Sequence, residues 1–82
     1  MQQSDVPEAF ARILADTTKV DRAAVARDKR LREDLGINSL SLIDVAVATE
    51  DTFGITIPDE ELERFQTVGD VVDHIQRLRI AV

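Results

Sequence analysis

Ser39 is the residue whose type and position best suit chemistry in this chain. It follows the turn Gly36-Ile37-Asn38 and begins an apolar segment with helical spacing. The start of a helix offers free backbone N–H groups and the positive end of the helix dipole. A phosphodiester attached there would be stabilised electrostatically. The alternative is that Ser39 only caps its helix, because Ser and Asn are both favoured at that position.

Other kinds of chemical site find little support in the sequence. His74 is the only histidine, and nothing places it near Ser39 as a Ser–His–Asp arrangement would require. A calcium loop beginning at Asp34 would need Gly and Glu where the chain has Ser39 and Val45. The chain has no Cys, which excludes disulfides and thiolate metal sites. We therefore expect no catalytic residue, no metal site and no enzyme activity.

The size and composition of the chain fit one small domain that spans residues 1–82. Apolar residues make up 44% of the 82, enough for a single compact core. No apolar run approaches the roughly 18–20 residues of a membrane span. Residues 1–5 are polar and acidic, unlike a secretory signal. These features predict a cytoplasmic protein without a membrane span, and we expect it to be a monomer.

Charge is distributed unevenly along the chain. The net charge is −6, and residues 33–63 carry nine acidic side chains and no basic one. A nucleic-acid site needs clustered Lys and Arg, so the sequence argues against it. The acidic stretch is either a solvated face that aids solubility or a surface for a basic partner. Most of the basic residues precede it, between residues 19 and 32.

The first half of the chain predicts one helix and one long loop. Ser4 or Asp5 can cap a helix that runs to about Asp16, and its apolar residues share one face: Val6, Phe10, Ile13 and Leu14. The segment 17–38 has no sustained periodicity. A loop of that length is uncommon in a compact domain. We expect it to be held on the core by Val20, Val25, Leu31 and Leu35, with one helical turn.

The second half predicts three more helices. The helix from Asn38 or Ser39 to Phe53 has Leu40, Ile43 and Val47 as its clearest apolar stripe, flanked by Leu42, Val45, Ala46 and Ala48. Gly54 fits its C-terminal cap. A short acidic helix, 59–64, turns Leu62 and Phe65 inward. The last helix starts with a capping box, Thr67 and Asp70, and its stripe is Val68, Val71, Val72, Ile75 and Leu78. The pattern predicts an all-α four-helix bundle with one short third helix.

Three motifs in register resemble those of acyl carrier proteins. Residues 34–40, Asp-Leu-Gly-Ile-Asn-Ser-Leu, are similar to the phosphopantetheine attachment motif D-L-G-x-D-S-L. Residues 57–61 resemble the family's "I-P-D-E" entry to its third helix, and residues 67–70 its "T-V-G-D" start of the last helix. The resemblance covers almost the whole chain and implies the acyl-carrier fold.

The resemblance implies a cofactor, a site and partners. Ser39 would receive 4'-phosphopantetheine from coenzyme A through a phosphopantetheinyl transferase, within a motif of Asp34, Gly36, Asn38 and Leu40. The thiol of the arm would hold acyl groups as thioesters for fatty-acid or related lipid biosynthesis. Partner synthases, reductases, dehydratases or acyltransferases would use basic patches to contact an acidic face. Asp44, Glu50 and Asp51 match the family's docking positions, and Glu60 and Glu61 would extend this face onto the short third helix.

Two positions depart from the family pattern. Asn38 stands where the family usually has Asp, and Ser41 replaces another common acidic residue. Both changes bear on how strongly fatty-acid enzymes bind. Asn38 favours the alternative of a carrier for polyketide or aminoacyl intermediates, whereas the acidic second helix favours a discrete acyl carrier. An alternative of a different class is an unmodified acidic interaction module in which Ser39 is only a helix cap.

Overall fold

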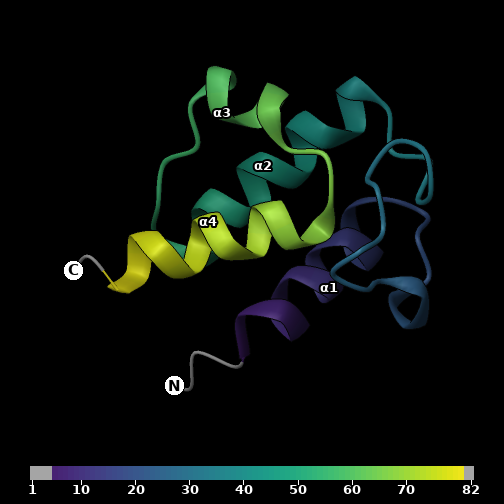
Figure 1. Cartoon of the computed structure of the whole chain (residues 1–82), viewed down its shortest axis with the longest axis horizontal. Helices are drawn as coiled ribbons and strands as arrows, with labels where there is room; N and C mark the ends of the chain where they lie inside the picture. Colours follow the sequence, from purple (N-terminus) through teal and green to yellow (C-terminus); the bar gives the residue numbers. More distant parts are fainter. Residues whose placement is uncertain (1–4, 81–82) are drawn as a thin grey trace.

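A computed structural model of the chain describes residues 5–80, with the side chains of residues 6–78 (Figure 1). Within this range the chain forms four α-helices and one short 3-10 turn: α1 (Asp5–Thr17), η1 (Arg22–Ala24), α2 (Ser39–Phe53), α3 (Asp59–Arg64) and α4 (Val68–Ile80). The predicted all-α bundle of three longer helices and a short third one is confirmed. Asp5 begins α1, whereas Ser4, the other predicted cap, lies outside the described residues.

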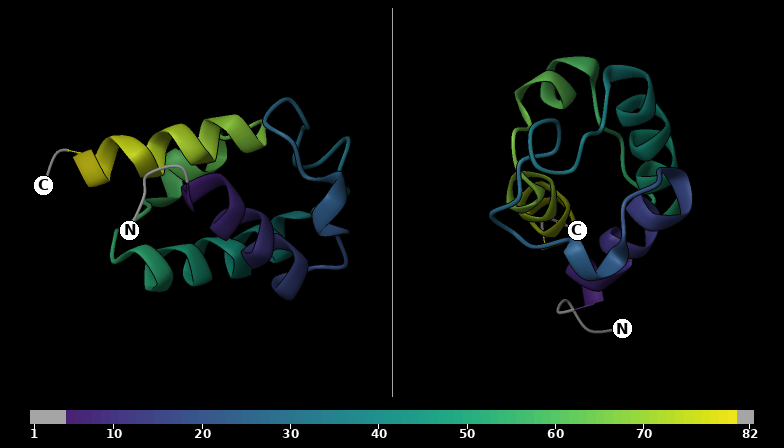
Figure 2. Two further views of the ribbon diagram at one scale, coloured as in Figure 1. Left: turned by 90° about the horizontal axis from the view of Figure 1, so that it is seen from below. Right: turned by 90° about the vertical axis from the view of Figure 1, so that its right-hand side faces the viewer.

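The three longer helices surround one core. α1 runs opposite to α2 and α4, and the start of α1 lies at the same end of the bundle as the end of α4 (Figures 1 and 2). The long connection between α1 and α2 covers the other end. The short α3 bridges α2 and α4 on the side away from α1 (Figure 1). Ser39 therefore begins its helix at the looped end of the bundle.

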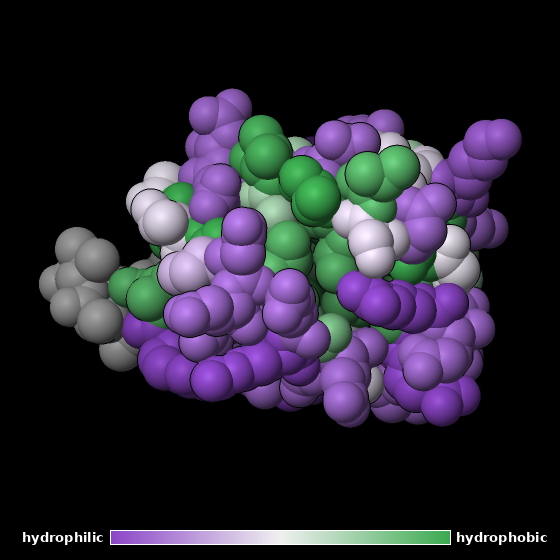
Figure 3. Space-filling view, turned by 90° about the horizontal axis from the view of Figure 1, so that it is seen from above, coloured by the Kyte–Doolittle hydropathy of each residue, from purple (hydrophilic) through white to green (hydrophobic). Residues whose placement is uncertain are grey.

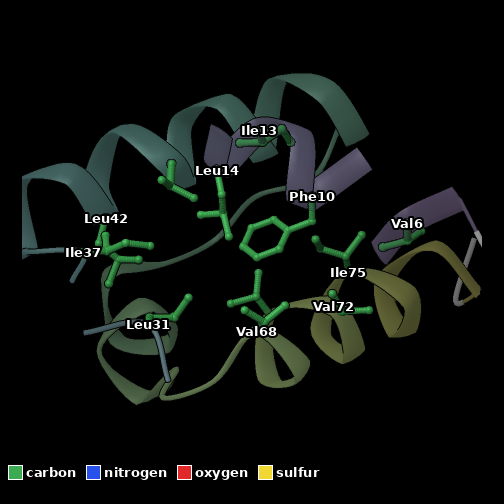
Figure 4. Packing of buried hydrophobic residues seen from close by; sticks show 12 residues of the cluster. Val6, Phe10, Ile13, Leu14, Leu31, Ile37, Leu42, Val68, Val72 and Ile75 are labelled. Carbon is green, nitrogen blue, oxygen red and sulfur yellow. The ribbon is translucent and has the colours of Figure 1, made fainter. Parts of the chain in front are cut away.

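Phe10 lies at the centre of the core. Figure 4 shows its ring between Leu14 of its own helix and side chains of α4, among them Val72 and Ile75. All four of these residues are fully buried. Burial of a side chain such as that of Phe10 contributes about 1.5–3 kcal/mol. The predicted core faces of α1 and α4 are confirmed, although Leu78 is only half-buried.

The core-facing side of α2 differs from the predicted stripe. Leu40, Ile43 and Val47 are 76%, 50% and 58% exposed. The buried face consists of Leu42, Val45, Ala46 and Thr49. Thr49 is compatible with the core because its hydroxyl donates a hydrogen bond of 2.7 Å to the Val45 carbonyl. The prediction was wrong because apolar residues lie around most of this helix, so spacing alone does not identify the side that packs.

The long loop is held on the core as predicted. Leu31 is buried, and Val20, Val25 and Leu35 pack partly buried against the same cluster. The loop also pairs with the chain that leads into α4: Leu31 N–H donates to the Gln66 carbonyl at 2.8 Å, and Val68 N–H to the Lys29 carbonyl at 3.0 Å. These contacts fix the segment that precedes Ser39.

Caps end α2 and begin α4. Gly54 follows α2 with φ 66° and ψ 38°, a left-handed conformation that favours glycine. Before α4, Thr67 Oγ1 accepts from Asp70 N–H, and the Asp70 carboxylate accepts from Thr67 N–H. The predicted capping box is confirmed. The segment 54–58 is an extended connection rather than a strand, with Ile57 buried.

Candidate functional site

Ser39 is exposed at the first position of α2. The residue before it, Asn38, is the N-cap: its Oδ1 accepts a hydrogen bond of 2.8 Å from Ser41 N–H. Its carbonyl accepts from Leu42 N–H at 2.9 Å. Asn38 and not Ser39 therefore caps α2, and the Ser39 hydroxyl is not needed to begin the helix.

The loop before Ser39 is closed by one carboxylate. Asp34 Oδ2 accepts from Arg30 N–H at 2.8 Å, and the Arg30 guanidinium lies 3.3 Å from the same oxygen. These hydrogen bonds, the backbone one first, hold the pKa of Asp34 below its usual value. Gly36 then turns the chain with φ 67°. Ile37 is buried, and its N–H donates to the Leu31 carbonyl at 2.9 Å.

A cavity of about 220 Å³ opens beside Ser39, between the start of α2 and α3. Its apolar lining comes from Leu42, Ile43 and Leu62. Its charged lining comes from Arg32, Asp59 and Glu63. An apolar chain linked to Ser39 could enter this cavity while its polar attachment stays in solvent.

The acidic residues predicted for docking divide into two groups. Asp44, Asp51 and Glu60 are exposed. Glu50 is half-buried, and its Oε2 accepts a hydrogen bond of 2.6 Å from Ile57 N–H. Glu61 is also half-buried and lies 3.6 Å from Arg64 and 3.9 Å from His74 Nδ1. Glu50 and Glu61 thus have contacts within the fold, whereas Asp44, Asp51 and Glu60 form no ion pair within 4.0 Å in the described part of the chain.

Exposed apolar side chains on α2 adjoin these carboxylates. Leu40, Ile43 and Val47 lie one turn apart along one side of the helix. Figure 3 views the molecule from the side of α2 and α3 and shows hydrophobic side chains reaching the surface among hydrophilic ones. Sequence reasoning assigned this stripe to the core and missed it as a surface. Its proximity to Ser39 and Asp44 was the signal that could have identified it.

His74 does not line the cavity beside Ser39. Its side chain is 12% exposed and packs edge-on against the Phe65 ring, with centroids 5.3 Å apart. Phe65 directly follows α3, so this ring contact joins the end of α3 to α4. Among the described residues no group of His, Cys, Asp and Glu side chains is arranged to hold a metal ion.

Comparison with known proteins decides the family. The sequence profile described as "Phosphopantetheine attachment site" matches residues 8–75. The chain is 42% identical over 76 residues to the meromycolate extension acyl carrier protein of Mycolicibacterium aurum, covering 93% of this chain and 78% of that protein. The chain belongs to the acyl carrier protein family. It is 40% identical to an acyl carrier protein of Rhodococcus erythropolis, over 93% and 84% of the two chains, and 37% identical to one of Thermobifida fusca, over 92% and 95%.

Membership of this family fixes the type of function. The carrier holds acyl groups as thioesters on covalently attached 4'-phosphopantetheine for lipid synthesis, and it is not itself an enzyme. Acyl carrier proteins interact in general with a phosphopantetheinyl transferase and with synthases and modifying enzymes. No helix in residues 5–80 has the length and apolar character of a membrane span.

The chemistry around α2 fits such a group. Ser39 is exposed, as modification by a transferase would require, and the adjacent cavity has an apolar lining that could shelter part of an acyl chain. The arm supplies the thiol that a chain without Cys lacks. The group would be surrounded by side chains that line the cavity: Ser39, Leu42, Ile43, Leu62 and Arg32.

Proposed function

We propose that Ser39 is the attachment point of the phosphopantetheine arm. The observation that carries this assignment is the exposed Ser39 hydroxyl at the first turn of α2, at the rim of an apolar-lined cavity. In the transfer, Ser39 Oγ loses its proton and forms a bond to the pantetheine-bearing phosphorus of the coenzyme A pyrophosphate. The anhydride P–O bond of that phosphorus breaks, and adenosine 3',5'-bisphosphate leaves. The positive end of α2 stabilises the attached phosphodiester.

The other motif residues shape the loop around Ser39. Asp34 closes the loop through Arg30, and Gly36 provides the left-handed turn. Asn38 caps α2, which leaves the Ser39 hydroxyl free to react. Leu40 is exposed immediately after Ser39 and offers an apolar contact to the transferase. Asp34, Gly36 and Asn38 act by placing Ser39, and none of the four residues reacts.

Partner enzymes dock on α2 and the start of α3. The exposed carboxylates of Asp44, Asp51 and Glu60 attract basic patches at the entrances of synthases, reductases, dehydratases or acyltransferases. Exposed charges of this kind chiefly raise association rates and select partners. Leu40, Ile43 and Val47 add a short-range apolar contact. Glu50 and Glu61 add to the negative electrostatic potential of this surface. They also stabilise the fold, through the Glu50–Ile57 hydrogen bond and the Glu61–Arg64 ion pair.

The acyl groups belong to fatty-acid or related lipid biosynthesis in the cytoplasm. This assignment is supported by the names of the relatives. They are called acyl carrier proteins, and several are called meromycolate extension acyl carrier proteins. The carrier acts as a single-domain monomer, so that each partner meets the same face of α2.

An acylation assay on the loaded carrier tests this function. The native chain is incubated with coenzyme A and a broad-specificity transferase, and then with an acyl-transfer enzyme and an activated fatty acid. We expect one acyl group per chain, released by hydroxylamine as a thioester is. The Ser39→Ala protein should stay folded and take up none, and Ser41→Ala should behave like the native chain. Acylation of Ser39→Ala would contradict the proposal.

A further inference from the structure

Arg32 is the basic side chain that lines the cavity beside Ser39. Two neighbouring arginines of the same loop have carboxylate partners: Arg27 lies 3.0 Å from Asp73, and Arg30 lies 3.3 Å from Asp34. Arg32 is exposed and forms no ion pair within 4.0 Å in the described part of the chain. Its guanidinium is therefore available to another anion.

The backbone at Arg32 is fixed although its side chain is free. Leu31 is 1% exposed, its N–H donates to the Gln66 carbonyl, and its carbonyl accepts from Ile37 N–H. The Asp34–Arg30 contacts close the loop on the other side of Arg32. The cost of ordering Arg32 for binding is then confined to its side chain.

The charges around this cavity are unbalanced. Asp59 and Glu63 also line it, so two carboxylates accompany a single cation. A phosphodiester on Ser39 would add a third negative charge at the rim. Of the charged groups that line the cavity, only Arg32 could offset it, and a guanidinium can donate two parallel hydrogen bonds to phosphate oxygens.

We infer that Arg32 binds the phosphodiester of the phosphopantetheine arm and holds the first part of the arm against the cavity mouth. This inference rests on the proposed attachment at Ser39. It deepens that assignment by giving the arm a second point of contact, through phosphate oxygens. The contact forms only in the loaded protein.

The test uses the full chain loaded with phosphopantetheine, in which phosphorus NMR observes the single phosphodiester. Four proteins are compared: native, Arg32→Gln, Arg32→Lys, and Arg22→Gln as a control, because Arg22 is an exposed arginine of the same loop that does not line the cavity. We expect Arg32→Gln to move the phosphorus resonance by more than its linewidth. Arg32→Lys should give an intermediate shift, and Arg22→Gln should give none.

Two further readouts separate this contact from its rivals. The Arg32 Nε–H signal of the native protein should move on loading, and the phosphorus resonance should approach its Arg32→Gln position in 1 M salt, where screening acts over about 3 Å. The inference is overturned if the Arg32 Nε–H signal moves when Glu63→Gln is introduced into the apo protein but stays in place when the native protein is loaded. Arg32 would then pair with Glu63. Identical phosphorus resonances in native and Arg32→Gln proteins also overturn it. Failure of the native chain to load would instead refute the attachment at Ser39.

Discussion

The Glu50 carboxylate accepts a hydrogen bond of 2.6 Å from the backbone N–H of Ile57, seven residues further along the chain. This contact ties the last turn of α2 to the connection that leads into α3. Ile57 is buried, and Glu50 is half-buried. Glu50, which the sequence predicts for partner docking, thus has a contact within the fold.

Replacing Glu50 should therefore lower the stability of the fold more than replacing its neighbour Asp51. Hydrogen bonds to charged groups are worth about 1.5–3 kcal/mol, and partial exposure reduces this one to about 1 kcal/mol. Glu50→Ala should lower the melting temperature by about 4–8 °C in a domain of this size. Asp51→Ala, at an exposed site, should change it by less than half as much. Equal melting temperatures for the two variants would show that the Glu50–Ile57 contact contributes nothing.

The capping box of α4 should give stability that depends on pH. Hydrogen bonds from the backbone N–H groups of Gln66 and Thr67 lower the pKa of Asp70 in the folded state. A lowered pKa stabilises the fold above the unfolded value of about 4, and this stabilisation disappears as pH falls through the folded pKa. Asp70→Ala should cost about 1 kcal/mol at pH 7.

Urea unfolding of native and Asp70→Ala proteins across pH 2–8 measures this dependence. The difference in unfolding free energy should be constant near neutral pH and should shrink below about pH 4. A difference that persists unchanged at the acid end would mean that the carboxylate charge has no part in the cap.

The exposed stripe of α2 should matter for transfer and not for folding. Val47 is 58% exposed and Val45 is 2% exposed, two residues apart on the same helix. Val47→Asn should leave the unfolding free energy within about 0.5 kcal/mol and lower kcat/KM with a cognate synthase about three- to tenfold. Val45→Asn should destabilise by about 1–3 kcal/mol because it buries an amide. Native transfer kinetics for Val47→Asn would place the docking surface elsewhere.

Asn38→Asp should speed loading by a transferase specialised for fatty-acid carriers. The change adds one negative charge beside Ser39, which a basic residue of such a transferase could pair with. An exposed charge pair is worth about 0.2–1 kcal/mol, so the loading rate should rise a few-fold. Asn and Asp cap helices about equally well, so stability should hardly change. Steady-state loading rates measure the effect. A slower reaction would make Asn38 a positive determinant of a dedicated transferase.

The sequence predicted the helices well because their signals are local. The apolar face of α1, the Thr67–Asp70 capping box and the glycine after α2 depend on residues within a few positions of each other. The anchoring of the loop by Leu31 was also predicted, since an unanchored loop of that length would be unusual.

Features that depend on distant contacts were not predicted. The pairing of Leu31 with Gln66 and of Arg27 with Asp73 joins residues far apart in sequence. The face of α2 that packs was assigned wrongly, because Val45 and Val47 are the same residue type and only tertiary contacts distinguish them. The cavity that joins Ser39 to Arg32 likewise depends on where α3 lies.

Peptide-level mass spectrometry of the loaded protein tests the central claim most directly. The chain is incubated with coenzyme A and a broad-specificity transferase and then digested, and the fragment that holds both Ser39 and Ser41 is sequenced. We predict one phosphopantetheine per chain, located on Ser39, and none on the Ser39→Ala protein. A group located on Ser41, or a Ser39→Ala protein that loads as the native one does, would contradict the account.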